Sequence, residues 1–183
     1  VENEVAMLEE ARDACHEANL AFAAPVPGEL LAALEARNSA LLRRAGTQRF
    51  EPGATWVDLF GEGIDTEELF QAYYYAVFVN ALAGAGKREH DVPMYVNAAL
   101  NRPGLRPGQY PSAGPLHHLF DIWKAAAPNL DFLAPDIYFP NFEELCKRYQ
   151  RPDNPFFVPE AGNGPDCVVH ALYAIGACGA NGF

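Results

Sequence analysis

The run Leu130-Asp131-Phe132-Leu133-Ala134-Pro135-Asp136-Ile137-Tyr138-Phe139 decides the fold class of this sequence. Its apolar middle predicts a buried β-strand, and polar residues follow it at once. Asn141, with Glu144 three residues later, is the pattern that begins an α-helix, and Leu145 and Tyr149 supply that helix with an apolar face. The chain therefore predicts a strand followed directly by a helix at this point.

The same alternation extends in both directions along the chain. The expected elements are a strand over 92–100, a helix over 116–126, a strand over 156–160 and a helix over 165–178. Strands that alternate with helices are typical of a parallel α/β sheet. Neither GxGxxG nor GxxxxGK[ST] occurs, so no motif favours a nucleotide-binding sheet.

Helical patterns dominate the part of the chain before this sheet. Residues 28–44 carry a stripe of leucines and predict one helix, which Gly46 ends. An irregular stretch is expected over 47–64. A second helix is expected from about Thr66, because Asp65 and Glu68 stand in a capping-box pattern.

The long loop that follows the 92–100 strand fits a (β/α)₈ barrel, which carries its functional loops at the carboxyl ends of its strands. A complete barrel typically needs about 250 residues, and the chain has 183. We therefore expect a partial TIM barrel, roughly the C-terminal half. On this interpretation residues 1–183 form one partial catalytic domain, and the N-terminal strands and any C-terminal domain belong to a longer parent protein.

The composition excludes some partners. With 13 basic and 24 acidic residues the formal charge is −11, which argues against nucleic acid and anionic membrane surfaces, because binding phosphate requires Lys and Arg. No apolar run approaches the ~20 residues of a membrane span. The four cysteines show no zinc-ligand spacing. No metal or other cofactor is expected.

Two short motifs near the ends of the chain each place a glutamate where a strand would end. One is Val1-Glu2-Asn3-Glu4-Val5 and the other is Pro155-Phe156-Phe157-Val158-Pro159-Glu160. A retaining glycosidase needs two carboxyl groups roughly 5 Å apart, one as proton donor and one as nucleophile. Glu4 and Glu160 could supply that pair. Glu2 would share a face with Glu4 on an ideal strand and is the alternative to it.

Several longer segments carry a family resemblance. They resemble bacterial β-galactosidases of glycoside hydrolase family 35, over nearly the whole chain, from the end of the fourth barrel strand to the start of the eighth. The segments are Val1–Val5 in the motif above, Pro93-Met94-Tyr95-Val96-Asn97-Ala98-Ala99-Leu100, Arg102-Pro103-Gly104, Pro107-Gly108-Gln109-Tyr110-Pro111-Ser112-Ala113-Gly114-Pro115, Asp131 to Phe142, and Phe157-Val158-Pro159-Glu160-Ala161.

The resemblance implies roles for four matching residues. Glu4 would be the general acid/base and Glu160 the nucleophile. Asn3 would contact the sugar 2-hydroxyl, a contact that strengthens in the oxocarbenium-like transition state. Tyr138 would donate a hydrogen bond to the nucleophile and keep it ionised.

Two further residues are candidates from their positions alone, and a third is expected to be structural. Asn97, near the end of its strand, could hydrogen-bond substrate or could cap the loop that follows. Tyr110, in that loop, could stack on the apolar face of a sugar. Asp136 is expected to make structural hydrogen bonds near the end of its strand.

These features together predict a retaining exo-glycosidase that releases terminal β-linked galactose from oligosaccharides or plant-polysaccharide fragments. The alternatives are another retaining β-glycosidase of the same clan, such as a β-glucosidase, and a non-catalytic carbohydrate-binding pseudoenzyme. The expected partner is a small saccharide, with no nucleic acid and no membrane insertion. The resemblance favours a periplasmic or secreted location. We expect the 183-residue chain alone to be inactive and its parent enzyme to be active.

Overall fold

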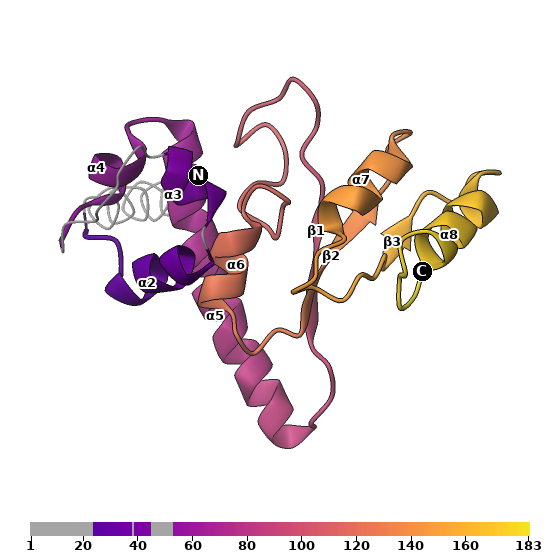
Figure 1. Cartoon of the computed structure of the whole chain (residues 1–183), viewed down its shortest axis with the longest axis horizontal. Helices are drawn as coiled ribbons and strands as arrows, with labels where there is room; N and C mark the ends of the chain where they lie inside the picture. Colours follow the sequence, from indigo (N-terminus) through magenta and orange to yellow (C-terminus); the bar gives the residue numbers. More distant parts are fainter. Residues whose placement is uncertain (1–23, 38, 45–52) are drawn as a thin grey trace, which may run out of the picture. The chain divides into compact units, whose positions relative to one another are not determined.

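The computed structural model describes residues 24–37, 39–44 and 53–183 (Figure 1). It contains two compact units, Val1–Phe70 and Gln71–Phe183. The elements in chain order are α2 (Gly28–Ala36), α3 (Ala40–Arg44), α4 (Trp56–Phe60), α5 (Ile64–Glu89), β1 (Tyr95–Ala99), α6 (Phe120–Ala126), β2 (Phe132–Ile137), α7 (Phe142–Tyr149), β3 (Glu160–Ala161) and α8 (Cys167–Gly176).

In the first unit the single helix predicted over 28–44 is wrong, because α2 and α3 are separate helices. Ser39 divides them: its N–H donates to the Leu34 carbonyl at 3.0 Å, and its hydroxyl accepts from the Leu41 N–H at 3.3 Å. The leucine stripe continues on both sides of this break, since Leu34 and Leu41 are both buried. Apolar periodicity therefore could not reveal it.

The stretch predicted as irregular contains a short helix, α4. A capping box begins it: the Thr55 hydroxyl accepts from the Asp58 N–H, and the Asp58 carboxylate accepts from the Thr55 N–H at 2.9 Å. The helix places Trp56 in the core, fully buried and packed edge-on against Phe70 at 5.6 Å between ring centroids. The next helix, α5, starts at Ile64, so the predicted cap at Asp65 is wrong.

The second unit is built on a parallel sheet with the strand order β1-β2-β3. Tyr95 on β1 pairs with Phe132 on β2, and this register continues to Ala99 and Asp136. The last five residues of β2 are buried, as expected for a central parallel strand whose two faces are both covered. The strands are parallel, as the alternation of elements predicts.

The expectation of a (β/α)₈ barrel, complete or partial, is wrong. The described residues form one open, three-stranded parallel sheet, and they show no eight-stranded closure. The alternation of strands and helices is common to every parallel α/β sheet. Strand number and closure depend on pairing between distant segments, so a local pattern cannot distinguish a barrel from an open sheet.

The predicted strand over 156–160 is also largely absent, since β3 pairs with β2 only at Asp136↔Glu160 and Ile137↔Ala161. Earlier on β2, the Asn154 side chain takes the place of a partner strand. Its amide nitrogen donates to the Leu133 carbonyl at 2.9 Å, and its amide oxygen accepts from the Leu133 N–H at 2.8 Å. One side chain thus satisfies both backbone groups of a buried strand residue.

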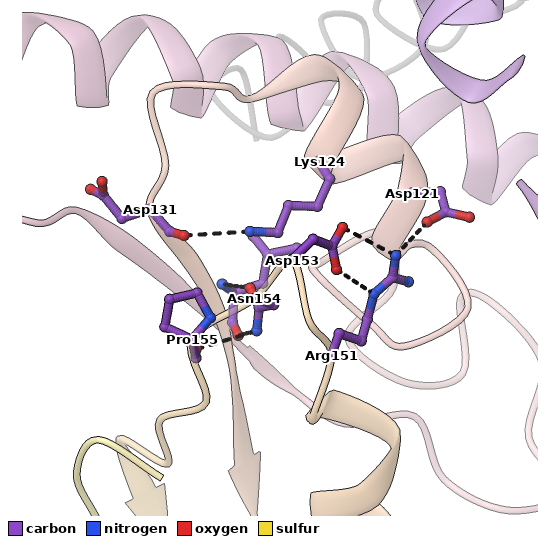
Figure 2. Close-up of polar contacts among 8 residues, drawn as sticks. Asp121, Lys124, Asp131, Arg151, Asp153, Asn154 and Pro155 are labelled. Carbon is purple, nitrogen blue, oxygen red and sulfur yellow. Dashed lines mark hydrogen bonds and ion pairs between the residues drawn. The ribbon is translucent and has the colours of Figure 1, made fainter. Parts of the chain in front are cut away.

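Arg151 holds the turn that carries Asn154 (Figure 2). Its guanidinium donates to Asp153 at 2.9 Å and to Asp121 on α6 at 3.0 Å, and it lies over the Phe120 ring at 4.9 Å. The turn is therefore tied to α6 on one side and to β2 on the other.

Helix α7 packs on β2, and α8 packs on α7. The buried face of α7 includes Tyr149, whose hydroxyl donates to the Pro115 carbonyl at 3.0 Å. Between the helices, the Phe142 and His170 rings stack at 4.1 Å between centroids. The apolar residues that the sequence places on α7, Leu145 and Tyr149, are therefore buried.

Candidate active-site edge of the parallel sheet

Parallel strands bring their carboxyl ends to one edge of a sheet, where α/β proteins bind ligands. Near this edge lie Asp136 on β2, Tyr138 just after β2, and Glu160, which begins β3. Asn97, the middle residue of β1, reaches Asp136 with its side chain. The register places Asp136 directly opposite Glu160. Four polar side chains from three strands therefore meet at one edge.

Tyr138 and Glu160 form one hydrogen-bonded pair at this edge. The Tyr138 hydroxyl donates to Glu160 Oε2 at 2.9 Å. Acceptance of this bond by Glu160, with smaller contributions from burial and from the charges of Glu160 and Asp136, raises the pKa of Tyr138. The phenol therefore stays protonated and remains a donor at neutral pH. Both side chains are exposed, Tyr138 by 60%.

Asn97 and Asp136 form the second pair. The Asn97 amide nitrogen lies 2.9 Å from each carboxylate oxygen of Asp136. Asp136 is only 7% exposed, and burial raises the pKa of its carboxyl; the bond from Asn97 opposes that rise, and the charge of Glu160 adds to it.

The two carboxyl groups at this edge therefore differ in what they can do. Glu160 is open to solvent, and among the described residues Tyr138 alone donates a hydrogen bond to it, so it can approach a ligand as a nucleophile or a base. Asp136 is buried and has both oxygens engaged by Asn97, so it cannot reach a ligand in the same way. Its expected structural role agrees with these contacts.

The structure brings together three of the residues predicted for the site: Asn97, Tyr138 and Glu160. Asn3 and Glu4 lie outside the described residues. Tyr110 lies in the loop between β1 and α6, where it is 9% exposed and its carbonyl accepts from the Ser112 hydroxyl at 2.8 Å. Its role in sugar stacking stays a prediction.

Asp136 was not among the predicted site residues, although a signal for it exists in the sequence. A charged residue within an otherwise apolar, buried strand needs a partner. That requirement identifies Asp136 as unusual, but it does not identify Asn97, 39 positions earlier in the chain, as the partner.

Two further properties concern the described residues only. No cluster of three or more His, Cys, Asp or Glu side chains with the arrangement of a metal site occurs among them. None of their helices combines the length and the apolar character that crossing a membrane requires.

The chain was also compared with known proteins. No protein-family model matches the sequence, and no curated protein matches it.

Proposed function

We propose that this protein is a retaining glycoside hydrolase that releases terminal β-linked galactose from oligosaccharides or plant-polysaccharide fragments. The observation that carries the proposal is the hydrogen bond from Tyr138 to the exposed carboxylate of Glu160, at the carboxyl edge of a parallel sheet. The choice of galactose rests on the resemblance of the sequence to family 35 β-galactosidases.

In the first step the Glu160 carboxylate attacks the anomeric carbon of the galactose unit. The bond between that carbon and the glycosidic oxygen breaks, and the departing oxygen takes a proton from Glu4. A covalent glycosyl ester on Glu160 results. The role of Glu4 comes from the resemblance alone.

In the second step water attacks the same carbon. Glu4, now ionised, removes a proton from that water as a general base. The ester bond breaks, galactose leaves with its original anomeric configuration, and Glu160 returns to its carboxylate form.

The surroundings of Glu160 support its assigned role. A nucleophilic carboxylate must be held in place while one of its oxygens stays free to attack, and a hydrogen bond to its other oxygen does this. Tyr138 supplies such a bond while leaving the second oxygen of Glu160 available. The exposure of both residues leaves room for a substrate at this edge.

Covalent trapping tests the proposal. The full-length protein is incubated with 2-deoxy-2-fluoro-β-galactosyl fluoride and with the matching glucosyl compound, and labelled peptides are located by mass spectrometry. We expect the galactosyl reagent to label Glu160. Preferential labelling by the glucosyl reagent would instead indicate a β-glucosidase, and no labelling of the folded protein would indicate a carbohydrate-binding pseudoenzyme.

Turnover of aryl β-glycosides by the full-length protein provides the matched control, and the full-length protein is used in every activity assay below. We expect Glu160→Gln to lower kcat on an aryl β-galactoside by on the order of 10³-fold or more, because the nucleophile is lost. Glu143→Gln changes the same residue type on α7, where Glu143 is exposed and pairs with Lys147 at 2.6 Å. This control should keep its activity; equal losses in both variants would contradict the assignment of Glu160.

A further inference from the structure

The hydrogen bonds between Asn97 and Asp136 fix which end of the Asn97 amide faces Asp136. An ionised carboxylate can only accept hydrogen bonds, and a side-chain amide has one donating and one accepting end. With both oxygens of Asp136 at 2.9 Å, the amide nitrogen of Asn97 must face Asp136. The carbonyl oxygen, Oδ1, must therefore face away from it.

Asn97 is otherwise open. Its side chain is exposed at the sheet edge, and no described residue donates a hydrogen bond to its Oδ1. Asp136, by contrast, is 7% exposed and lies opposite Glu160 in the register. One end of the amide is thus held by a buried group, and the other end faces away from that group. Asp136, which holds the amide, lies on the strand between Asn97 on β1 and Glu160 on β3.

We propose that Asp136 is a positioning residue that fixes the Asn97 amide so that Oδ1 accepts a hydrogen bond from a substrate hydroxyl. This inference rests on the proposed function and adds a requirement for specificity. The substrate group that bonds Asn97 Oδ1 must be a hydrogen-bond donor. A neutral, hydroxyl-bearing sugar satisfies this requirement, whereas a phosphate or carboxylate on the substrate would face Oδ1 and the carboxylates of Asp136 and Glu160.

The variant Asp136→Asn tests the positioning role, because it keeps the shape of the side chain. The new amide can donate to Asn97 as well as accept from it, so Asn97 is free to turn over. We expect kcat/KM on an aryl β-galactoside to fall roughly 3- to 10-fold, as for the loss of one neutral hydrogen bond.

The control is Asp131→Asn, the same change at the residue that precedes the same strand, β2. Asp131 accepts from the Met94 N–H at 2.7 Å and pairs with Lys87 at 2.7 Å, away from the carboxyl edge. We expect kcat/KM of this variant to match that of the unsubstituted protein, provided both are assayed well below their unfolding temperatures.

A panel of monodeoxy aryl β-galactosides separates positioning from simple structural support. In the unsubstituted protein, removal of the hydroxyl that meets Asn97 should lower kcat/KM. In Asp136→Asn the same removal should have less effect, since the contact is already weakened. If each deoxy sugar lowers kcat/KM by the same factor in both proteins, Asp136 has only a structural role and the inference is overturned.

The side-chain amide resonances of Asn97 test the orientation without any turnover. In ¹H–¹⁵N spectra, assigned with an Asn97→Asp variant, we expect these protons to be displaced downfield by the carboxylate and to return toward exposed positions in Asp136→Asn. This result without galactosidase activity would reject the proposed function and retain the amide orientation. Unchanged resonances in Asp136→Asn would overturn the inference even if the protein is an active galactosidase.

Discussion

At the scale of single residues, two tyrosines of the second unit show how environment assigns a role. Tyr149 is fully buried, and its hydroxyl donates to the Pro115 carbonyl; burial raises the pKa of this phenol. Tyr138 is 60% exposed and donates to Glu160. The Tyr149 hydroxyl bonds a backbone carbonyl within the core, whereas the Tyr138 hydroxyl bonds a carboxylate at the sheet edge.

The exposed tyrosine gives the first prediction. Tyr138→Phe keeps the ring and removes only the hydroxyl that donates to Glu160. We therefore expect kcat on an aryl β-galactoside to fall roughly 10-fold or more, because a hydrogen bond to the charged nucleophile is lost. Because the ring is exposed, the unfolding temperature should change little. Steady-state kinetics and thermal unfolding together check this; a large loss of stability would indicate that Tyr138 is a packing residue.

His117 gives a pH-dependent prediction. Arg148 has no acceptor, so its donation at 3.2 Å makes the His117 Nε2 an acceptor and the ring neutral. Burial, with the charges of His118 and Arg148 and against that of Glu144, lowers the pKa of His117 from 6.5 to about 4. In the unfolded chain His117 takes up its proton near pH 6.5, and in the folded chain it does so only near pH 4.

Stability should therefore fall as the pH drops from about 6.5 to about 4, and His117 should contribute no further loss below that. The slope should be well under ~1.4 kcal/mol per pH unit, because solvent screens a partly exposed ring. Urea unfolding of the protein and of His117→Gln over this range measures the difference. Parallel curves for the two proteins would contradict the assignment.

At the scale of elements, β3 shows why strand boundaries are hard to derive from sequence. The residues 156–160 have a strand-like apolar pattern, yet only Glu160 and Ala161 pair with β2. Earlier in this segment the backbone bonds elsewhere: the Asn181 N–H donates to the Phe156 carbonyl at 2.8 Å, and the Val158 N–H donates to the Gly182 carbonyl at 3.2 Å. Asn154 occupies the edge of β2 that a longer β3 would have used.

This substitution of a side chain for a strand can be tested. Asn154→Ala leaves the N–H and C=O of Leu133 without partners in a buried strand, so we expect a loss of about 2–4 kcal/mol in the free energy of unfolding. Asn163→Ala, at an exposed asparagine, is the control and should cost less than ~0.5 kcal/mol. Urea unfolding measures both, and equal costs would show that the two hydrogen bonds to Leu133 add nothing.

At the scale of the whole molecule, the chain has two compact units and one tryptophan in each. Trp56 in the first unit and Trp123 in the second are 0% and 2% exposed. Each unit has a core of its own, which is the condition for a separate cooperative transition. The two tryptophans can therefore report on the two units independently.

We expect different urea midpoints when Trp fluorescence is followed in Trp56→Phe and in Trp123→Phe. In each variant the remaining tryptophan reports on the unit that was left unchanged, so a difference reflects the units and not the substitutions. The unsubstituted protein should then show a broad or two-step transition by circular dichroism. Coincident transitions in all three proteins would show that the chain unfolds as a single unit.

Local sequence was sufficient for features that depend on neighbouring residues. The alternation of strands and helices around Phe132–Ile137, the parallel direction of the sheet, and the position of Tyr138 directly after a strand all follow from short apolar runs and the breaks between them. The break at Ser39 and the helix α4 were not predicted, because α3 and α4 have only five residues each and such short helices show little apolar periodicity.

Only the tertiary structure decided how many strands pair and which polar side chains meet. The sheet has three strands and stays open, Asn154 replaces part of a strand, and Asn97 joins Asp136. The partners in these last two contacts lie 21 and 39 residues apart in the chain. A contact of that kind costs chain entropy and forms only when the rest of the fold brings both partners together, so it leaves no periodic trace in the sequence.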